Sequence, residues 1–498
     1  MSRDHRSHRR TLYEIAHQAM LERDLVPDFP REIQVQLRNL RDGAPAPATL
    51  EDGLERSDLR HLPWASIDND DSLDLDQLTV AEPLDDGAVR MRIAVADVDA
   101  LVGKGTAIDD RARHNTTTVY TSGGIFPMLP ERLSTDLTSL NADEDRAAIV
   151  TELDVDRAGR PVRSTILAAV VRNRAKLAYD AVAAWLDGEG RMPSPIGAVE
   201  GLEATLRLQD RVAQRLRARR YDHGALDLET IQTRAEFEDD RIVALRVDTK
   251  NRARELIEDF MIAANGVTAR FLRDRGLPSL RRVVREPQRW GRIVEVAAEH
   301  DFELPETPDG AALSEFLAVQ RELDPLRFPD LSLTVVKLIG SGEYVLEYPG
   351  EAPAGHFGLA VRNYMHSTAP NRRFPDLITQ RLVKSALGGT RRAYDARELA
   401  DLGPHCTRKE DDADKVERRL RKSAAALLLE DSIGKRFEAI VTGASEKGTW
   451  VRILDPHVEG MLVEGGDRVD VGDRLQVELI ATDVERGYID FRKVRSRS

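Results

Sequence analysis

The residues with the clearest chemical potential form an acidic loop, Asp68 to Asp76, which contains five aspartates and no basic residue. Like charges this close repel each other unless a cation or water compensates. Asp74 and Asp76 should share one side of an extended segment, and Asp68 should reach the same point through a turn. Apolar residues alternate with the acids and are expected to anchor the loop to a core, namely Ile67, Leu73, Leu75 and Leu78.

Carboxylates that converge in this way suit one or two Mg²⁺ ions, with Mn²⁺ as an alternative. A calcium loop of the EF-hand type is excluded, because its required Gly and Glu positions are occupied here by Leu73 and Thr79. Magnesium held by Asp68, Asp74 and Asp76 would serve the hydrolysis of a phosphodiester. A solvated acidic loop without a metal is the alternative for such a run taken alone.

The elements that must position this loop follow from the hydrophobic periodicity. Two short helices are expected within residues 11–41, and strands dominate residues 61–170. Helices are expected at 174–187, 197–220 and 251–273, with a strand pair at 235–247 before the last of them. Helical segments continue to about residue 430, interrupted by a Gly-rich hairpin at 337–350. The pattern predicts an α+β multidomain protein.

The acidic loop resembles the signature of the RNB family of exoribonucleases, roughly Thr-Ile-Asp, five residues, Asp-x-Asp-Asp-Ala. Asp68, Asp74 and Asp76 fall on the first three acidic positions of that signature. The fourth position holds Gln77, and a neutral amide does not replace a carboxylate on a cation. This departure leaves two functions open, an active nuclease and a catalytically impaired protein of the same fold that binds RNA.

Four further segments resemble the family in the family's order, over residues 61–390. Their match implies that Tyr120 contacts the 3′-terminal nucleotide and that Glu258 faces the terminal nucleotides. It also places Arg372 on an arginine that contacts the phosphate at the cleavage site, beside Arg373. The resemblance implies that single-stranded RNA threads into a channel 3′ end first and is cut processively to nucleoside 5′-monophosphates. A two-metal nuclease acting on DNA is a weaker alternative.

The last 65 residues change character to five short strands with Gly turns, which predicts a barrel. They resemble the OB-fold RNA-binding domain first described in ribosomal protein S-one. Phe437 is expected in the barrel core, whereas Trp450 is either core or a platform on which a base stacks. The predicted division is a helical N-terminal domain at 1–45, in which a helix-turn-helix is one option, a linker at 46–60, an RNB domain at 61–430 and the barrel at 431–498.

Composition excludes several classes. No apolar run approaches the roughly 20 residues that cross a bilayer, and the basic start leads into no secretory signal. A single cysteine, Cys406, excludes an intramolecular disulfide and points to a reducing cytoplasm. The net charge of −13 does not decide for or against RNA, because basic clusters lie apart from the acidic loop. We expect a cytoplasmic monomer that binds no membrane.

Overall fold

The structure, a computed structural model, describes residues 7–40, 53–229, 231–248, 250–389, 393–445, 448–466, 469 and 471–494. Its centre is a seven-stranded sheet in the order β1-β8-β7-β4-β3-β2-β9. The strands are β1 (Arg56–Asp58), β2 (Ala65–Asp68), β3 (Gln77–Pro83), β4 (Val89–Ala96), β7 (Asp145–Val155), β8 (Pro161–Arg172) and β9 (Ala175–Ala178). Strands β3, β4, β7 and β8 form an antiparallel meander, whereas β1 and β2 pair in parallel with β8 and β9.

Alternation of side chains along β4 explains why this segment lies at the centre of the sheet. Met91 and Ile93 are fully buried on one face. On the other face Arg90 and Arg92 each form an ion pair with their register partners on β7, Asp154 and Glu152. The sheet therefore has an apolar face toward the core and a ladder of paired charges on its second face.

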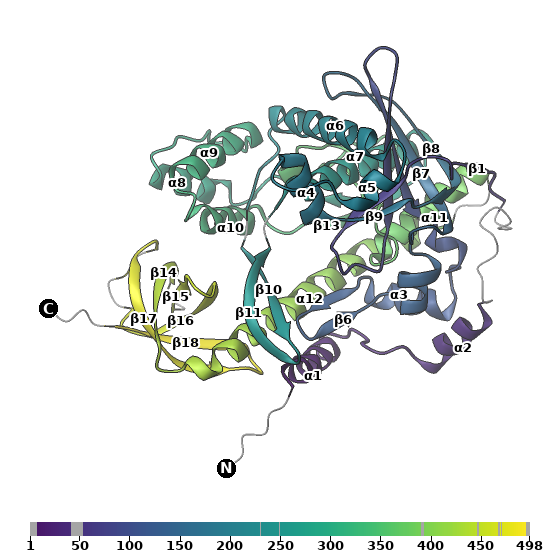
Figure 1. The fold of residues 1–498 in the computed structure, drawn as a ribbon. Helices are drawn as coiled ribbons and strands as arrows, with labels where there is room; N and C mark the ends of the chain where they lie inside the picture. The colour runs from purple at the N-terminus through teal and green to yellow at the C-terminus, as the bar shows by residue number, and fades with distance from the viewer. Residues whose placement is uncertain are drawn as a thin grey trace.

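Helices cover this sheet and carry part of the site (Figure 1). The long helix α6 (Leu202–Asp222) packs against β3, and α7 (Arg252–Asp274) packs against α6 and the strands β2, β7 and β8. The other helices between β4 and the barrel, besides α12, are α3 (Ala107–Asn115), α4 (Tyr179–Asp187), α5 (Ser194–Ala198), α8 (Trp290–Glu299), α9 (Gly310–Leu323), α10 (Phe328–Ile339) and α11 (Phe374–Gly388). The helices predicted at 174–187, 197–220 and 251–273 are thus confirmed, apart from the strand β9 at the start of the first.

The two predicted N-terminal helices are present as α1 (His8–Leu21) and α2 (Arg31–Asn39). The buried face of α1 packs against the long helix α12 (Ala396–Leu429), whereas α2 packs against α3 and joins the main core. Each helix therefore packs against later parts of the chain. Residues 46–52 of the predicted linker lie outside the described residues, and residues 56–58 within it form strand β1, so the bounds of the linker stay a prediction.

The Gly-rich segment at 337–350 is not the predicted hairpin. Helix α10 ends at Ile339, and β13 (Glu343–Glu347) pairs with β12 (Ser279–Val283) rather than with a neighbour in sequence. The strand pair predicted at 235–247 is confirmed as β10 (Gln232–Glu238) and β11 (Arg241–Asp248), which packs against α12. A second short pair, β5 (Val119–Thr121) and β6 (Gly124–Phe126), lies beside the same helix.

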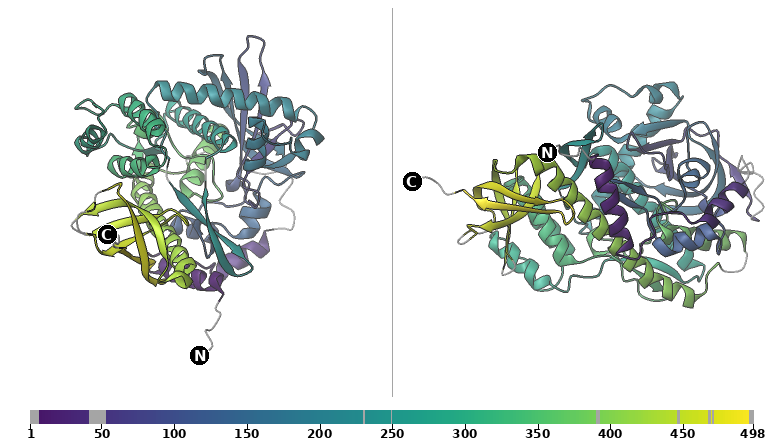
Figure 2. Two further views of the ribbon diagram at one scale, coloured as in Figure 1. Left: turned by 60° about the vertical axis from the view of Figure 1, so that its left-hand side comes forward. Right: turned by 90° about the horizontal axis from the view of Figure 1, so that it is seen from below.

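The C-terminal strands close into the predicted five-stranded barrel, in the order β14-β15-β16-β18-β17. They are β14 (Arg436–Ser445), β15 (Gly448–Ile453), β16 (Val458–Glu464), β17 (Arg474–Asp483) and β18 (Tyr488–Lys493). The barrel lies at one end of α12, with α1 alongside that helix (Figure 2). Ala425, Ala426 and Leu429 at the end of α12 enter the barrel core. Among the described residues, no helix combines the length and apolarity needed to cross a membrane.

Candidate active site

The acidic loop, residues 68–76, leaves the end of β2 and returns into β3. Asp68 Oδ1 accepts hydrogen bonds from the Asn69 amide at 2.7 Å and from Ser72 Oγ at 2.9 Å, which closes a tight turn after the strand. Ile67, Leu75 and Leu78 are buried as expected. Leu73 is 62% exposed, so its predicted role as an anchor is wrong.

A serine and a threonine that the sequence analysis did not single out supply the missing anchor. Ser139 Oγ donates to the Leu73 carbonyl at 2.7 Å and accepts from the Leu75 amide at 3.0 Å. The preceding Thr138 donates to the Asn371 side chain at 2.5 Å. These two residues follow a π-helical turn, Arg132–Leu137, an irregularity frequent at functional sites. They join the acidic loop to the segment that carries Arg372.

Asp76 lies at the bottom of this arrangement, with 2% of its surface exposed. Its carboxylate accepts hydrogen bonds from the Asn371 amide and from Arg372 Nε, both at 3.2 Å. Burial raises the pKa of Asp76 to about 7, despite the opposing effect of Arg372. Burial also raises the pKa of Asp74, and the charge of Asp68 adds to this shift. The charge of Asp68 therefore acts on Asp74, and the charge of Asp74 acts on Asp76.

Tyr120 lies beside Asp74 and Arg372 beside Asp76, and the space that these four side chains border is called the recess. The Tyr120 hydroxyl donates to Asp74 Oδ2 at 3.3 Å, and its backbone amide donates to Glu417 of α12. Tyr120 is 40% exposed and the Arg372 side chain 43% exposed, yet burial raises the pKa of the Tyr120 hydroxyl. The Tyr120 side chain thus keeps accessible surface while its hydroxyl lies in a desolvated environment.

Two further residues at the site were not found from sequence. Tyr179, at the start of α4, has a pKa raised by burial and by the charge of Asp68. The Arg254 guanidinium lies over the Tyr179 ring, 4.9 Å from its centroid, and donates to Asn69 Oδ1 at 2.9 Å. The spacing of Arg254 and Glu258, four residues apart on one helix, is the signal in the sequence that could have found the arginine.

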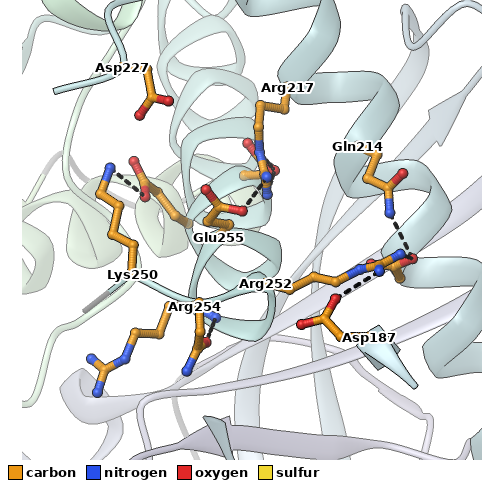
Figure 3. A network of polar contacts seen from close by, with 12 residues as sticks. Asp187, Gln214, Arg217, Asp227, Lys250, Arg252, Arg254 and Glu255 are labelled. Atoms are coloured by element: carbon orange, nitrogen blue, oxygen red, sulfur yellow. Dashed lines mark hydrogen bonds and ion pairs between the residues drawn. The ribbon is translucent and has the colours of Figure 1, made fainter. Parts of the chain in front are cut away.

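The remaining predicted residues lie farther out. Glu258 on α7 is 45% exposed in its side chain and lies 4.0 Å from Lys250, whose side chain is visible in Figure 3. Arg373 donates to the fully buried Asp376 at 2.8 Å. That contact places Arg373 in the support of α11, so its predicted contact with RNA stays a prediction.

Trp450 belongs to the barrel and not to the recess. It faces Gly443 across strands β14 and β15, and its ring packs over that glycine. Trp450 is half-buried and lies outside the barrel's buried core, whereas the partly buried Phe437 packs against that core. The tryptophan is therefore available as a platform on the barrel surface, and Phe437 has the core position expected of it.

The donor chemistry of the site fits Mg²⁺ or Mn²⁺. Burial disfavours the ionised form of Asp74 and Asp76, and a bound divalent cation would stabilise that form. As the side chains lie, no three His, Cys, Asp or Glu residues among those described gather into a ready metal-binding group. The site thus suits Mg²⁺ or Mn²⁺ by the type of its donor atoms and by its electrostatics, and not by a preformed cluster of ligands.

Comparison with protein families agrees with this geometry. The family model of the RNB domain matches residues 56–389, which is most of the chain. The chain belongs to the RNB family. The model of the RNase II-type exonuclease C-terminal S1 domain matches residues 435–494, the segment that forms the barrel.

Curated relatives of this RNB protein include ribonuclease R of Escherichia coli (strain K12), which is 30% identical over 512 residues. That alignment covers 94% of this chain and 60% of the relative, so the chain spans about three fifths of the relative's length. Exoribonuclease 2 of Salmonella heidelberg (strain SL476) is 29% identical over 436 residues, covering 86% of this chain and 66% of the relative.

Solved structures share the fold of this RNB protein. Mycoplasma genitalium RNase R in complex with ribose methylated single-stranded RNA superposes with a TM-score of 0.86 at 22% identity, covering 96% of this chain and 77% of that one. Yeast Ssd1, a pseudonuclease, superposes with a TM-score of 0.65 at 16% identity, covering 85% of this chain and 52% of its own. The RNB fold therefore occurs in at least one protein described as catalytically inactive.

Proposed function

We propose that this protein is a metal-dependent exoribonuclease that degrades single-stranded RNA from its 3′ end to nucleoside 5′-monophosphates. The observation that carries the proposal is the buried Asp76 carboxylate, held by Arg372 beneath a recess lined by Tyr120. Membership of the RNB family and similarity to ribonuclease R support RNA as the substrate.

In this proposal Asp68, Asp74 and Asp76 hold Mg²⁺, which when bound supplies the charge that polarises the scissile phosphate and activates water. Arg372 has a separate task. Its Nε donates to Asp76, which orients the guanidinium, while 43% of the side-chain surface is exposed. The guanidinium can therefore donate to a phosphate oxygen and stabilise charge that develops there.

The exonuclease proposal relies on residues that would contact the end of a single strand. Tyr120 offers a ring to the terminal base and a hydroxyl close to Asp74, and Glu258 is proposed to face the terminal ribose. Trp450 on the S1-type barrel offers a second stacking surface farther along the strand.

A catalytically impaired RNA-binding protein is the second candidate function. It is favoured by Gln77, which stands at the start of β3 where the family signature has a carboxylate, and by the pseudonuclease that shares the fold. The first candidate is preferred because Asp68, Asp74 and Asp76 are all present, and their electrostatics suit a cation.

One time course separates the two candidates. A 5′-labelled single-stranded RNA is incubated with Mg²⁺ and either the wild type or Asp76→Asn, with a DNA oligomer of the same sequence as control. A ladder that shortens from the 3′ end of RNA alone, and that the variant abolishes, supports the exoribonuclease. Intact RNA in both reactions, together with a band shift, supports the binding protein, and equal cleavage of DNA contradicts the RNA preference.

A further inference from the structure

Three basic side chains from three different elements contact the turn at residues 69–71, which separates Asp68 from Asp74. The contacts are from Arg254 of α7 to Asn69 Oδ1 at 2.9 Å, from Lys176 of β9 to the Asp70 carbonyl at 3.2 Å, and from Arg234 of β10 to Asp71 Oδ2 at 2.6 Å. Each successive residue of the turn thus has its own cation. Such an arrangement fixes the direction in which the loop leaves Asp68.

The three contacts differ in how much they constrain the turn. Arg234 and Asp71 are 65% and 66% exposed in their side chains, and exposed pairs of this kind contribute roughly 0–1 kcal/mol. The contact of Lys176 is likewise exposed. That of Arg254 is partly buried, and the guanidinium is held from a second side by the Tyr179 ring. Arg254 is therefore the contact that constrains the turn most.

The start of α7 is a firm base for Arg254. Asn251 caps the helix by accepting from the Arg254 amide at 3.0 Å. Figure 3 shows Arg252 directed toward Asp187 and Arg217 paired with Glu255, while Arg254 points away from both groups. These ion pairs hold the first turns of α7 against its neighbours. Arg254 therefore contacts the turn at 69–71 from a rigid helix.

The position of Arg254 on the helix links two parts of the site. Residues four apart lie on one face of a helix, so Arg254 and Glu258 share the face that borders the acidic loop. The same helical turn thus holds Asn69 through one side chain and presents Glu258 through the other. A shift of the turn relative to α7 would change the distance between the carboxylates and the residue proposed to face the terminal ribose.

We propose that Arg254 is a positioning residue that acts through Asn69: it fixes the turn at 69–71 and thereby keeps Asp68 aligned with Asp74 and Asp76 for a divalent cation. The inference rests on the proposed function for the identity of the ligand. An arginine suits this task better than a lysine, because its planar group can stack on Tyr179 and donate to Asn69 at the same time.

The test measures Mn²⁺ binding to the metal-free protein by electron paramagnetic resonance, which needs no RNA cleavage. Arg254→Met is expected to weaken Mn²⁺ binding about tenfold, a loss of about 1.4 kcal/mol. Arg254→Lys is expected to recover only part of it. The matched control is Arg207→Met, because the Arg207 guanidinium also lies over an aromatic ring, Trp185, at 4.5 Å but away from the turn. This control should bind Mn²⁺ like the wild type.

A double-mutant cycle decides whether Arg254 acts through Asn69. If it does, Arg254→Met combined with Asn69→Ala weakens Mn²⁺ binding no more than the stronger single variant. Additive losses would overturn the inference. So would unchanged Mn²⁺ binding in Arg254→Met together with weaker RNA binding in EDTA, which would make Arg254 a direct RNA contact. Thermal unfolding of Arg254→Met guards against a loss of fold in that variant, and Arg254→Lys is the second variant if the first does not fold.

The outcomes also separate this inference from the proposed function. A wild type that binds Mn²⁺ but leaves RNA intact refutes the exoribonuclease and leaves the role of Arg254 to be decided by the cycle. A wild type that cleaves RNA, with full Mn²⁺ binding in Arg254→Met, refutes the positioning role alone. A wild type that binds no Mn²⁺ overturns the positioning role directly.

Discussion

Replacing Asp76 by asparagine should stabilise the metal-free protein while it abolishes RNA cleavage. The side chain is 2% exposed, and burial raises its pKa from 3.8 to about 7. Because the pKa in the folded state lies above the ordinary value, the folded protein binds this proton more tightly than the unfolded chain does. The resulting stabilisation is complete below about pH 4 and is lost as the pH rises to about 7.

The magnitude follows from the distance between pH and pKa. At pH 5 the pH lies about two units below the pKa of Asp76, and each unit is worth about 1.4 kcal/mol of stabilisation. At pH 8 the carboxylate is ionised and this stabilisation is lost, so the free energy of unfolding of the wild type falls by about 3 kcal/mol. An asparagine avoids that cost but gives up one hydrogen bond, because the Asn371 amide and Arg372 Nε donate to different carboxylate oxygens and an amide has one oxygen. The lost hydrogen bond costs about 1 kcal/mol at every pH, which is less than the cost of ionisation. The stability difference between Asp76→Asn and the wild type should therefore widen by about 3 kcal/mol over this range.

Urea unfolding in EDTA at several pH values measures that difference. Asp70→Asn is the matched control, because Asp70 lies in the exposed turn of the same loop, where solvent already surrounds its carboxylate. Adding Mg²⁺ at pH 8 should stabilise the wild type by binding to the folded state and leave Asp76→Asn nearly unchanged. A variant that is less stable than the wild type at pH 8 in EDTA, or a difference independent of pH, would refute the reasoning.

Four further substitutions probe the rest of the site. Arg372→Lys should lower the rate of single-turnover cleavage about 100-fold, because the planar donor group is lost. An unchanged rate would exclude contact with the phosphate. Tyr120→Ala should weaken binding of short RNAs about tenfold in EDTA while Tyr120→Phe largely keeps it, and equal losses would exclude stacking. Trp450→Ala should weaken binding of long RNAs about tenfold in fluorescence anisotropy, and a lost thermal transition of the barrel would instead mean a core role. Gln77→Asp should lower the Mg²⁺ concentration for half-maximal cleavage several-fold, and a higher concentration would mean that this position is not near the cation.

The parts of the site that could be predicted are those set by local spacing. Asp74 and Asp76 lie close together, as an alternating segment before a strand predicts. The family resemblance of five segments in order predicted that Tyr120 and Arg372 lie beside them, as they do. Arg254 and Asn69, by contrast, are 185 residues apart, and nothing local in either segment specifies the partner. Leu73 is exposed because Ser139 holds the loop by its backbone, so apolarity alone misplaced it.

The fold shows the same division. Hydrophobic periodicity predicted α1, α2 and α7 and the barrel strands, since these patterns are properties of one segment. Pairing between distant segments was not visible: β13 follows a glycine-rich turn that favours a hairpin, yet its partner β12 lies some sixty residues earlier. The cytoplasmic location, the monomeric state and the domain boundaries stay predictions.

The long helix α12 has a consequence for how the protein is made. Tyr120 is held through its amide by Glu417, 297 residues later, and Asp76 by Arg372, 296 residues later. Helix α1, which precedes all of these residues in the chain, packs on the same α12. A nascent chain can pair β3, β4, β7 and β8 early, but it has no closed recess until α12 has emerged. An enzyme proposed to destroy RNA would thus acquire its active site only after Glu417, which follows Tyr120 by 297 residues, has been translated.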